Sequence, residues 1–297
     1  MLAAAATLAA VDVLRNRFRL CEWVLLAYYG YVAASATAFG LGAGVVARAW
    51  LVPAAAALLF LLLSTAALQP ARDWVVLGLV LLAYREMDWF SHTYKARRLE
   101  QLWLGWDHRY LFDRGFREWI EAAGAPLPAV LELSYLLVYG IGVFLLAALY
   151  VAKRQDRANA YLTTYLVGTL LAYAMFPYFP SDPPRVLFPG MDLPNVVTAM
   201  RRLNLWLVGG YGIHSSVFPS AHVSSAFSAA WGVVRFLPER KWVGRVAVIY
   251  AATVSVATVY GRYHYAADAV AGFAVSLVAL AASYAIGGSP RARRFGR

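Results

Sequence analysis

The sequence predicts an all-α fold: a polytopic bundle of about eight transmembrane helices, with further amphipathic helices lying at the membrane surface. Three observations carry this prediction. The chain of 297 residues is 61% hydrophobic and only 14% charged, whereas a soluble domain carries roughly a quarter charged residues. It contains 10 Trp and 19 Tyr, whose amphipathic rings gather where lipid meets water. Apolar runs of membrane length recur along the whole chain.

Each predicted span is an apolar run near the length of about 20 residues that a helix needs to cross the hydrocarbon core. The runs are 20–44, 50–69, 72–90, 129–151, 159–179, 217–237, 243–261 and 266–287. The third run has a short apolar centre, because Arg85, Glu86 and Asp88 lie in it. We expect this run either to be partly re-entrant or to pack inside the bundle.

Two intervals between the runs are too polar to span a membrane. In 91–124, charged residues interleave with Trp, Leu and Tyr, a mixture typical of helices that lie in the interface plane. The interval 180–216 is rich in Pro and Gly and leads directly into the sixth run. We therefore divide the chain into N-terminal transmembrane spans (1–90), an interfacial amphipathic segment (91–124), a catalytic core (125–287) and a basic cytoplasmic tail (288–297).

Lys and Arg in the short loops predict the orientation, because these residues concentrate on the cytoplasmic side of membrane proteins. With eight spans, the basic clusters at 15–19, 153–157, 235–245 and 291–297 all fall on one side. Both termini are then cytoplasmic, and the expected location is the bacterial inner membrane. The stretch 91–117 is also basic and would face outward, against this rule. The net charge of +11 is divided among loops rather than gathered in a groove, which excludes nucleic acid as a partner.

The string VFPSAHVSSAF, residues 217–227, places a serine and a histidine at the start of the sixth run. Proline is tolerated in a first helical turn, and the free N–H groups that follow it form an anion site with the helix dipole. Ser220 adds a hydroxyl donor, and His222 is placed to give a proton to a bound oxyanion. The alternative interpretation is an ordinary helix start with a histidine packed among its neighbours.

The string GRYHYAADAVAG, residues 261–272, begins the eighth run. His264 and Asp268 are four residues apart and therefore lie on one helical face. A carboxylate on one ring nitrogen fixes the tautomer and leaves the other nitrogen free as a nucleophile or base. A histidine–aspartate pair that only locks two helices together is the structural alternative.

The string PYFPSDPPRVLFPG, residues 177–190, follows the fifth run. Its closely spaced prolines stiffen the chain and keep it extended. Arg185 emerges from this rigid segment, and guanidinium is the preferred bidentate clamp for phosphate. An interfacial arginine that touches lipid headgroups is the alternative.

Taken together, the three strings have a recognisable order: Arg, then Pro-Ser-x-His, then His-x-x-x-Asp, each beside a membrane run. This order resembles the type 2 phosphatidic acid phosphatase superfamily, which includes lipid phosphatases, phosphotransferases and vanadium haloperoxidases. The Pro-Pro-Arg form and the His-Tyr before Ala-Ala-Asp look most like the subgroup of inositol phosphorylceramide synthases. The resemblance covers about 125–287 and implies a six-helix phosphatase-type core there, whereas the N-terminal spans match less specifically.

The resemblance implies a catalytic role for three residues. His264 would be the nucleophile that takes the phosphoryl group, Asp268 would orient and charge it, and His222 would protonate the leaving oxygen and later activate the acceptor. Phosphoryl transfer depends mainly on positioning and charge stabilisation, and splitting it through a phosphohistidine is covalent catalysis. The expected enzyme is a phosphoric ester hydrolase or phosphotransferase.

The resemblance also implies that Arg185, Ser220 and the backbone N–H of Ala221 hold the phosphate oxygens. No metal or cofactor is expected, because cationic side chains and a helix end take the place of a metal ion. The single cysteine, Cys21, excludes an intramolecular disulfide and a cysteine metal cluster.

The chain departs from the family pattern at three positions. Ala221 stands where phosphatases usually have Gly, Tyr178 stands where a Lys is common, and Thr258 stands where an Arg is usual. The predicted phosphate pocket is therefore less cationic than that of a typical phosphatase, which favours a transferase. We expect Arg262, two residues before His264, to curl over the pocket and supply the second clamp. The alternative is that Arg262 snorkels to lipid headgroups.

The function expected from these residues is transfer or hydrolysis of lipid phosphates on the extracytoplasmic face. The partners are a lipid phosphate, a lipid alcohol acceptor in the transferase version, and membrane lipids. The transferase version moves a headgroup as an inositol phosphorylceramide synthase does, and the phosphatase version cleaves phosphatidate or a polyprenyl diphosphate. A membrane carrier would place ionisable residues near span centres in two related halves, which the sequence does not show. A haloperoxidase-like oxidant is disfavoured by the lipid-embedded bundle, and the oligomeric state stays open.

The remaining histidines are weaker candidates. His214 in GGYGIHSS either lines the mouth of the site or is a hydrogen-bonded loop residue. His92 and His108 lie in the interfacial segment without partners at an informative spacing, so we expect them at the surface.

Overall fold

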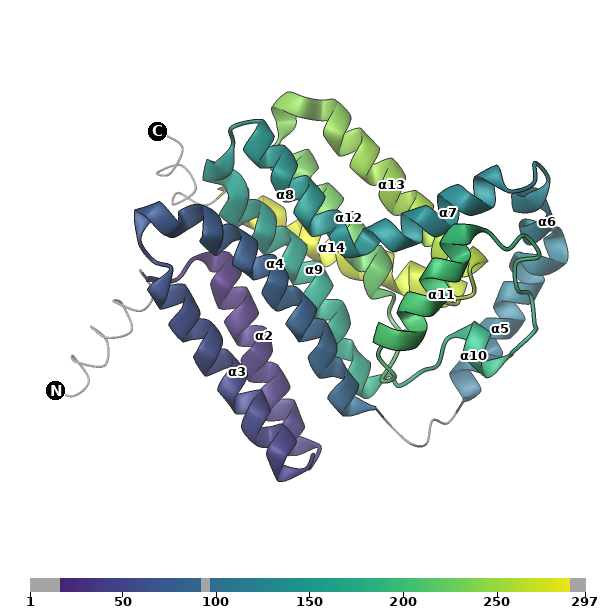
Figure 1. Ribbon diagram of the computed structural model, residues 1–297, viewed down its shortest axis with the longest axis horizontal. Coiled ribbons are helices and arrows are strands. Elements are labelled where there is room, and N and C mark those ends of the chain that lie inside the picture. Colours follow the sequence, from purple (N-terminus) through teal and green to yellow (C-terminus); the bar gives the residue numbers. More distant parts are fainter. Residues whose placement is uncertain (1–16, 92–96, 289–297) are drawn as a thin grey trace, which may run out of the picture.

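The computed structural model describes residues 17–91 and 97–288, and its secondary structure is helical throughout these ranges (Figure 1). The all-α prediction is therefore confirmed for the described part of the chain. Arg15, His92 and the predicted basic tail beyond Gly288 lie outside the described residues.

Three long helices form the N-terminal part: α2 (Leu20–Ala38), α3 (Ala43–Leu62) and α4 (Gln69–Glu86). The turn between α2 and α3 comes earlier than predicted, because Gly40 has a φ of +65°, the left-handed conformation that ends helices. The helix α3 therefore begins inside the first predicted run, and the predicted bounds of the first two spans are corrected accordingly. The helix α2 packs against both α3 and α9.

Buried charges hold α4 against α2. Arg72 donates hydrogen bonds to the Glu22 carboxylate at 2.5 and 2.6 Å, Arg19 pairs with Asp73, and the Tyr150 hydroxyl donates to Asp73 at 2.6 Å. Charges in a membrane-length helix are costly unless they are paired. The third predicted run is thus the helix α4 followed by a 3-10 turn, Met87–Phe90. Its Arg72 and Asp73 are paired inside the bundle, which favours the second of the two expected arrangements, whereas the Glu86 carboxylate is buried without a hydrogen-bond partner among the described residues.

The rest of the bundle is built around a central pair of helices, α9 (Ala158–Met175) and α12 (Ala221–Phe236). The helices around this pair are α7 (Pro126–Leu137), α8 (Ile141–Val151), α13 (Lys241–Tyr260) and α14 (Ala266–Gly288). The helix α12 packs against α9, α13 and α14, and the Ser224 hydroxyl donates to the Gly168 carbonyl of α9 at 2.8 Å. Most side chains of α9 and α12 are buried, so these two helices form the centre of the bundle.

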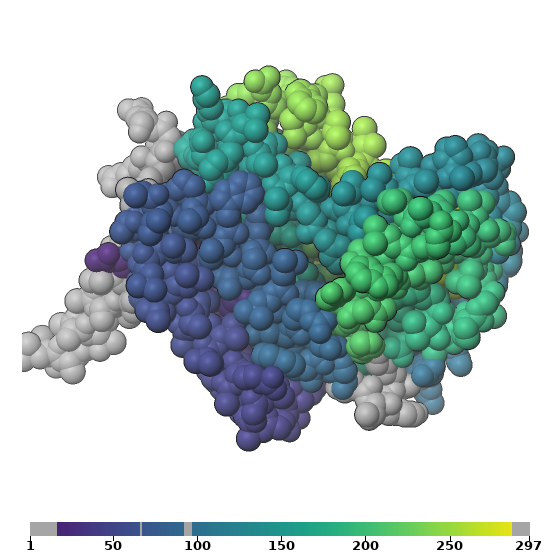
Figure 2. Space-filling model, in the orientation of Figure 1, coloured from purple at the N-terminus to yellow at the C-terminus, as the bar shows by residue number. Residues whose placement is uncertain are grey.

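Four further helices cover one end of the bundle: α5 (Arg98–Tyr110), α6 (Phe116–Glu121), α10 (Pro184–Leu187) and α11 (Ala199–Tyr211). They lie together on the side away from α2 and α3 (Figure 1). Figure 2 shows that the surface is hollowed between α4 and α11. The helix α5, part of the predicted interfacial segment, buries Glu100, Trp103 and Asp107.

Four helical stretches of the described residues are long and apolar enough to cross a membrane: Ala43–Leu62, Pro126–Val151, Pro238–Tyr260 and Ala266–Ile286. The helices at the other four predicted spans are shorter or more polar. A helix buried among other helices does not need an apolar surface all round, which accounts for the hydroxyl-rich sequences of α9 and α12. The total of about eight spans stays a prediction.

Candidate active site

The start of α12 presents the first of the predicted polar groups. Ser220 is the N-cap residue, and its hydroxyl oxygen accepts a hydrogen bond from the Val223 amide at 3.4 Å. The Ser220 amide donates to the Asp268 carbonyl at 2.9 Å. A hydroxyl can accept and donate at the same time, so capping leaves its proton available for an anion. The ordinary helix start and the anion site are therefore compatible here.

The helix α14 approaches this helix start closely. A Cβ atom at Gly272 would lie 2.3 Å from the Ser220 carbonyl oxygen, which is too short for any side chain. Glycine at this position allows α14 to lie against Ser220. The close approach places the N-terminus of α14, with Asp268, beside the N-terminus of α12.

The His264 loop, residues 261–265, joins α13 to α14. The Thr258 carbonyl accepts hydrogen bonds from the amides of Tyr263 and His264, both at 3.0 Å. Arg262 has a φ of +58°, in the left-handed region that residues with side chains rarely adopt. The tight turn leaves the His264 side chain buried, with the residue only 4% exposed.

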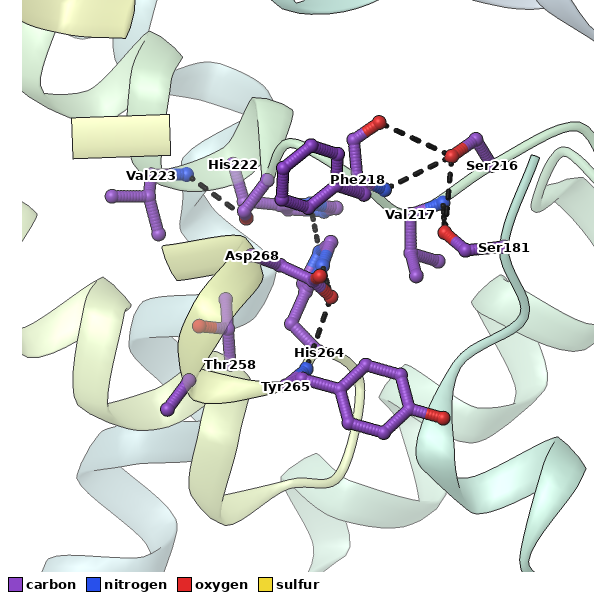
Figure 3. A network of polar contacts seen from close by, with 12 residues as sticks. Ser181, Ser216, Val217, Phe218, His222, Val223, Thr258, His264, Tyr265 and Asp268 are labelled. Atoms are coloured by element: carbon purple, nitrogen blue, oxygen red, sulfur yellow. Dashed lines mark hydrogen bonds and ion pairs between the residues drawn. The ribbon is translucent and has the colours of Figure 1, made fainter. Parts of the chain in front are cut away.

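His264 and Asp268 form the pair that their spacing predicted. His264 Nδ1 lies 3.2 Å from Asp268 Oδ2, and the same oxygen accepts from the Tyr265 amide at 3.0 Å (Figure 3). When Nδ1 carries the proton that faces this carboxylate, Nε2 keeps its lone pair. The ring of His264 is thus held in one orientation, with the lone pair on Nε2.

The two predicted catalytic histidines meet across the bundle. His264 Nε2 lies 3.3 Å from His222 Nδ1 (Figure 3). The other nitrogen of His222, Nε2, lies 3.2 Å from the Tyr139 hydroxyl, and the His222 ring stacks on Tyr135 with centroids 4.7 Å apart. Sequence analysis missed both tyrosines. Their separation of four residues, which puts them on one helical face, was the only signal available.

Arg185 lies beside the His264 loop, because a backbone hydrogen bond joins α10 to that loop. The Arg185 amide donates to the Arg262 carbonyl at 3.2 Å, and the Arg185 guanidinium lies 5.1 Å from the centre of the Tyr263 ring. Within the described ranges, no carboxylate forms an ion pair with Arg185. Its positive charge is therefore available to an anion at the histidine pair.

The environment of His264 favours a neutral ring. Burial lowers the pKa of the His264 imidazole to about 3, the positive charge of Arg185 adds to this shift, and a hydrogen bond with the Val217 backbone opposes it. A neutral imidazole is the form that can attack phosphorus, because protonation would remove the lone pair on Nε2.

Arg262 departs from the predicted geometry. Its side chain is fully buried, and the guanidinium pairs with Asp107 at 2.9 Å and lies 4.8 Å from the centre of the Phe112 ring. A second carboxylate, that of Asp192, lies 3.8 Å away. Because the charge of Arg262 is already neutralised by carboxylates, we do not assign this residue to phosphate binding. Neither does it snorkel to a lipid surface.

The lesser histidines lie away from the pair. The His214 side chain is 77% exposed, and its amide donates to Asp88 at 2.8 Å. His108, expected at the surface, has a side chain that is 33% exposed and lies 3.0 Å from Asp192 and 3.5 Å from Asp113. The contact with Asp192 had no signal in the sequence spacing, because the two residues are 84 positions apart.

A small cavity of about 50 Å³ lies beside His222. A single water needs roughly 10–15 Å³ of such space, so the cavity has room for a few water molecules. It is lined by Val80, Leu81, Tyr84, Val138, Tyr139, Tyr165, Tyr173, Ala221, His222 and Ser225. In the part of the chain that the structure describes, no group of three or more His, Cys, Asp or Glu side chains could hold a metal ion.

Comparison with known proteins gives one match. A family model described as the PAP2 superfamily matches residues 101–282, more than half of the chain. The matched region contains Arg185, the α12 start and the His264–Asp268 pair, and it begins within α5. Neither the curated proteins nor the solved structures contain a match.

Proposed function

The chain belongs to the PAP2 superfamily, and on that premise we propose that it is a membrane enzyme that transfers the phosphate group of a lipid through a covalent phosphohistidine on His264. The observation that carries the proposal is the contact of 3.3 Å between His264 Nε2 and His222 Nδ1, with Asp268 behind His264. A nucleophile, an orienting carboxylate and a second imidazole within reach of the nucleophile are the parts that a double displacement needs.

In the first step, His264 Nε2 attacks phosphorus and the bond from phosphorus to the lipid oxygen breaks. In the complex, the negative charge of the bound phosphate would stabilise His222 as an imidazolium. The leaving oxygen takes a proton from it, so the lipid departs as an alcohol and His222 becomes neutral. In the second step, neutral His222 removes a proton from water or from an acceptor alcohol. The acceptor oxygen attacks phosphorus, and the bond to His264 Nε2 breaks. Both histidines return to their starting states.

Three groups would hold the phosphate oxygens during both steps: the Arg185 guanidinium, the Ser220 hydroxyl and the Ala221 N–H at the start of α12. Charge on the transferring group is spread over its equatorial oxygens, and preorganised donors stabilise that charge without reorganisation. Support comes from the unpaired charge of Arg185 and from the attachment of α10 to the His264 loop. The helix dipole of α12 adds to this field.

The charge of the site favours headgroup transfer over monoester hydrolysis. A phosphate monoester carries about −1.5 to −2 charges at neutral pH, whereas a phosphodiester carries one. Thr258 is uncharged and Arg262 is neutralised by Asp107, whereas Arg185 lies beside the His264 loop and has no carboxylate partner among the described residues. One guanidinium matches a phosphodiester lipid. We therefore propose transfer of a phospho-headgroup to a lipid alcohol, as in inositol phosphorylceramide synthases, on the extracytoplasmic face.

The proposal is tested with purified protein and two labelled lipids, a monoester (phosphatidate) and a diester (phosphatidylinositol). Each is incubated with and without a lipid alcohol, either ceramide or diacylglycerol, and the His264→Ala variant is the control. Headgroup transfer predicts a new phospholipid that requires both the diester and the alcohol. Free phosphate released from phosphatidate at the same rate in all mixtures would instead identify a phosphatase. Products that persist in His264→Ala would contradict the proposal altogether.

A further inference from the structure

The His264 loop is held in place from outside the helices that carry the catalytic motifs. Two tyrosines that precede His264 donate hydrogen bonds to carboxylates of α6 and α7: the Tyr260 hydroxyl to Glu121 at 2.9 Å and the Tyr263 hydroxyl to Glu132 at 2.8 Å. A third carboxylate, Asp107 of α5, contacts the loop at two points. None of these three acids belongs to the motifs that identified the site.

Asp107 contacts the chain on both sides of the nucleophile. Its Oδ2 accepts from the Arg262 guanidinium at 2.9 Å, two residues before His264. Its Oδ1 accepts from the Ala266 amide at 3.0 Å, two residues after His264. One carboxylate therefore spans the turn that presents His264, and it also caps the first turn of α14.

The turn needs such support. Arg262 has a φ of +58°, and a residue with a side chain holds this conformation only where its surroundings fix it. The Arg262 side chain is fully buried, and its Nε and Nη2 atoms have no hydrogen-bond partner among the described residues. Asp107 thus supplies the close counter-charge of a buried guanidinium on a strained backbone.

The helix α5 is itself fixed against both catalytic motifs. The Trp103 ring stacks on Phe218, two residues before Ser220, with centroids 4.9 Å apart. The same ring lies 5.6 Å from the Tyr265 ring, next to His264. Asp107 is one turn further along α5, and only 1% of it is exposed. The anchor that holds the His264 loop is therefore rigid.

We propose that Asp107 is a positioning residue for His264: it holds the backbone on both sides of the nucleophile so that Nε2 faces His222. This inference rests on the proposed function, because it assigns Asp107 to the same reaction. It also gives α5 a role beyond lying at the membrane surface. Arg262, predicted as a phosphate clamp, becomes the partner through which Asp107 fixes the turn.

The test must separate positioning from simple charge balance. The double variant Asp107→Ala/Arg262→Met removes both charges, so no buried ion is left unpaired, and such replacements often keep the fold. Positioning predicts that kcat falls by about 10²-fold while KM changes by less than about threefold, since a misplaced nucleophile slows chemistry more than binding. Asp107→Asn, which keeps an acceptor for the Ala266 amide, should lose about tenfold in kcat. A kcat within twofold of wild type in either variant would overturn the inference.

A matched control and a second readout keep the test decisive. Asp113→Asn makes the same change beside α5 at a side chain that is 66% exposed, and it should leave kcat and KM unaltered. Hydrogen–deuterium exchange of the peptide 260–268 should be faster in both Asp107 variants and unchanged in Asp113→Asn. If exchange responds in this way but His264→Ala is fully active, the proposed function fails and the structural anchor stands. Unchanged exchange in the Asp107 variants would refute the anchor itself.

Discussion

His264 and His222 have different surroundings, and these surroundings assign them different chemistry. His264 faces a carboxylate on one side and His222 on the other, so it has a fixed orientation and one free nitrogen. His222 faces the Tyr139 hydroxyl and a small cavity that has room for a few water molecules. His264, the proposed nucleophile, is thus enclosed, whereas His222, the proposed proton-transfer residue, borders the cavity.

Replacing the nucleophile and its orienting carboxylate should have separable effects. His264→Ala should abolish turnover, because no other group can form the covalent intermediate. Asp268→Asn should leave a folded protein whose kcat is lower by about 10³- to 10⁴-fold, since a mis-set tautomer costs about 10⁴-fold in the serine triad. Steady-state kinetics on protein of verified thermal stability measure both effects. Wild-type kcat in Asp268→Asn would show that the carboxylate has no part in the reaction.

The titration of His264 can be predicted from its burial. The pKa of its imidazole is lowered from the ordinary 6.5 to about 3, so the ring stays neutral through the mildly acidic range. Between these two values the unfolded chain binds a proton that the native chain does not, so His264 destabilises the fold as pH falls through that window. Nitrogen-15 NMR of histidine-labelled protein, assigned with His264→Gln, reports the charge directly. Titration of this ring near 6.5 would contradict the enclosed site.

Local sequence patterns were informative wherever a motif is contiguous. The pairing of His264 with Asp268 follows from helical spacing and is present in the structure. The contacts of the Arg262 side chain could not be derived in the same way, because its partner Asp107 is 155 positions away in the sequence. A long flexible side chain reaches several sites from one backbone position, and the fold decides among them.

At the scale of helices, close approach between α12 and α14 forms the site. Asp268 and His264 come from the α14 side, and Ser220 and His222 come from the α12 side. The two helix starts are joined by the hydrogen bond from the Ser220 amide to the Asp268 carbonyl. Gly272 permits this contact, since any Cβ there would collide with the backbone of Ser220. The spacing of the histidines thus depends on one glycine that lies four residues after Asp268, outside the His-x-x-x-Asp pattern.

Gly272→Ala should therefore damage the site without touching a catalytic residue. The added methyl group would lie 2.3 Å from the Ser220 carbonyl oxygen, so the two helix starts must move apart. A displacement of this kind should lower kcat by about tenfold or more. Gly78→Ala in α4 is the matched control, because nothing lies within 4 Å of the new Cβ atom. Equal kcat values for the two variants would show that the α12–α14 contact does not set the geometry.

The interfacial segment shows where helix-level prediction stops. The mixture of charges and aromatic residues correctly indicated amphipathic helices, and α5 and α6 are present. Sequence alone did not show which charges face inward, because buried Asp107 and exposed Asp113 are the same residue type in similar surroundings. The difference arises only when α13 and α14 place the His264 loop against α5.

At the scale of the whole molecule, the chain combines a buried histidine pair with an N-terminal group of helices. Their buried ion pairs, such as Arg72 with Glu22, join residues 50 positions apart and are invisible to a search for apolar runs. The all-α class could be predicted from composition, because that prediction does not depend on which distant residues contact each other. The number of spans is harder to predict, since buried helices can be polar while lipid-facing helices cannot.

The predicted orientation can be tested by cysteine labelling in intact cells. The single native cysteine, Cys21, is buried, and replacing it with serine gives a silent background. A cysteine at exposed position Met191 should react with a membrane-impermeant maleimide in intact cells, because this loop belongs to the site face. A cysteine at exposed position Gln155 should react only after permeabilisation. The reverse pattern would place the active site in the cytoplasm.

The central claim is that a phosphate group passes through His264, and trapping that intermediate tests it most directly. Wild-type protein is mixed with lipid substrate labelled at phosphorus, quenched in alkali within one turnover, and digested for mass spectrometry, because phosphohistidine survives base but not acid. We expect a phosphoryl-type adduct on His264, formed and lost at rates that match kcat, and none in His264→Ala. Full turnover with His264 unmodified at every quench time, or an adduct on His222 instead, would contradict it.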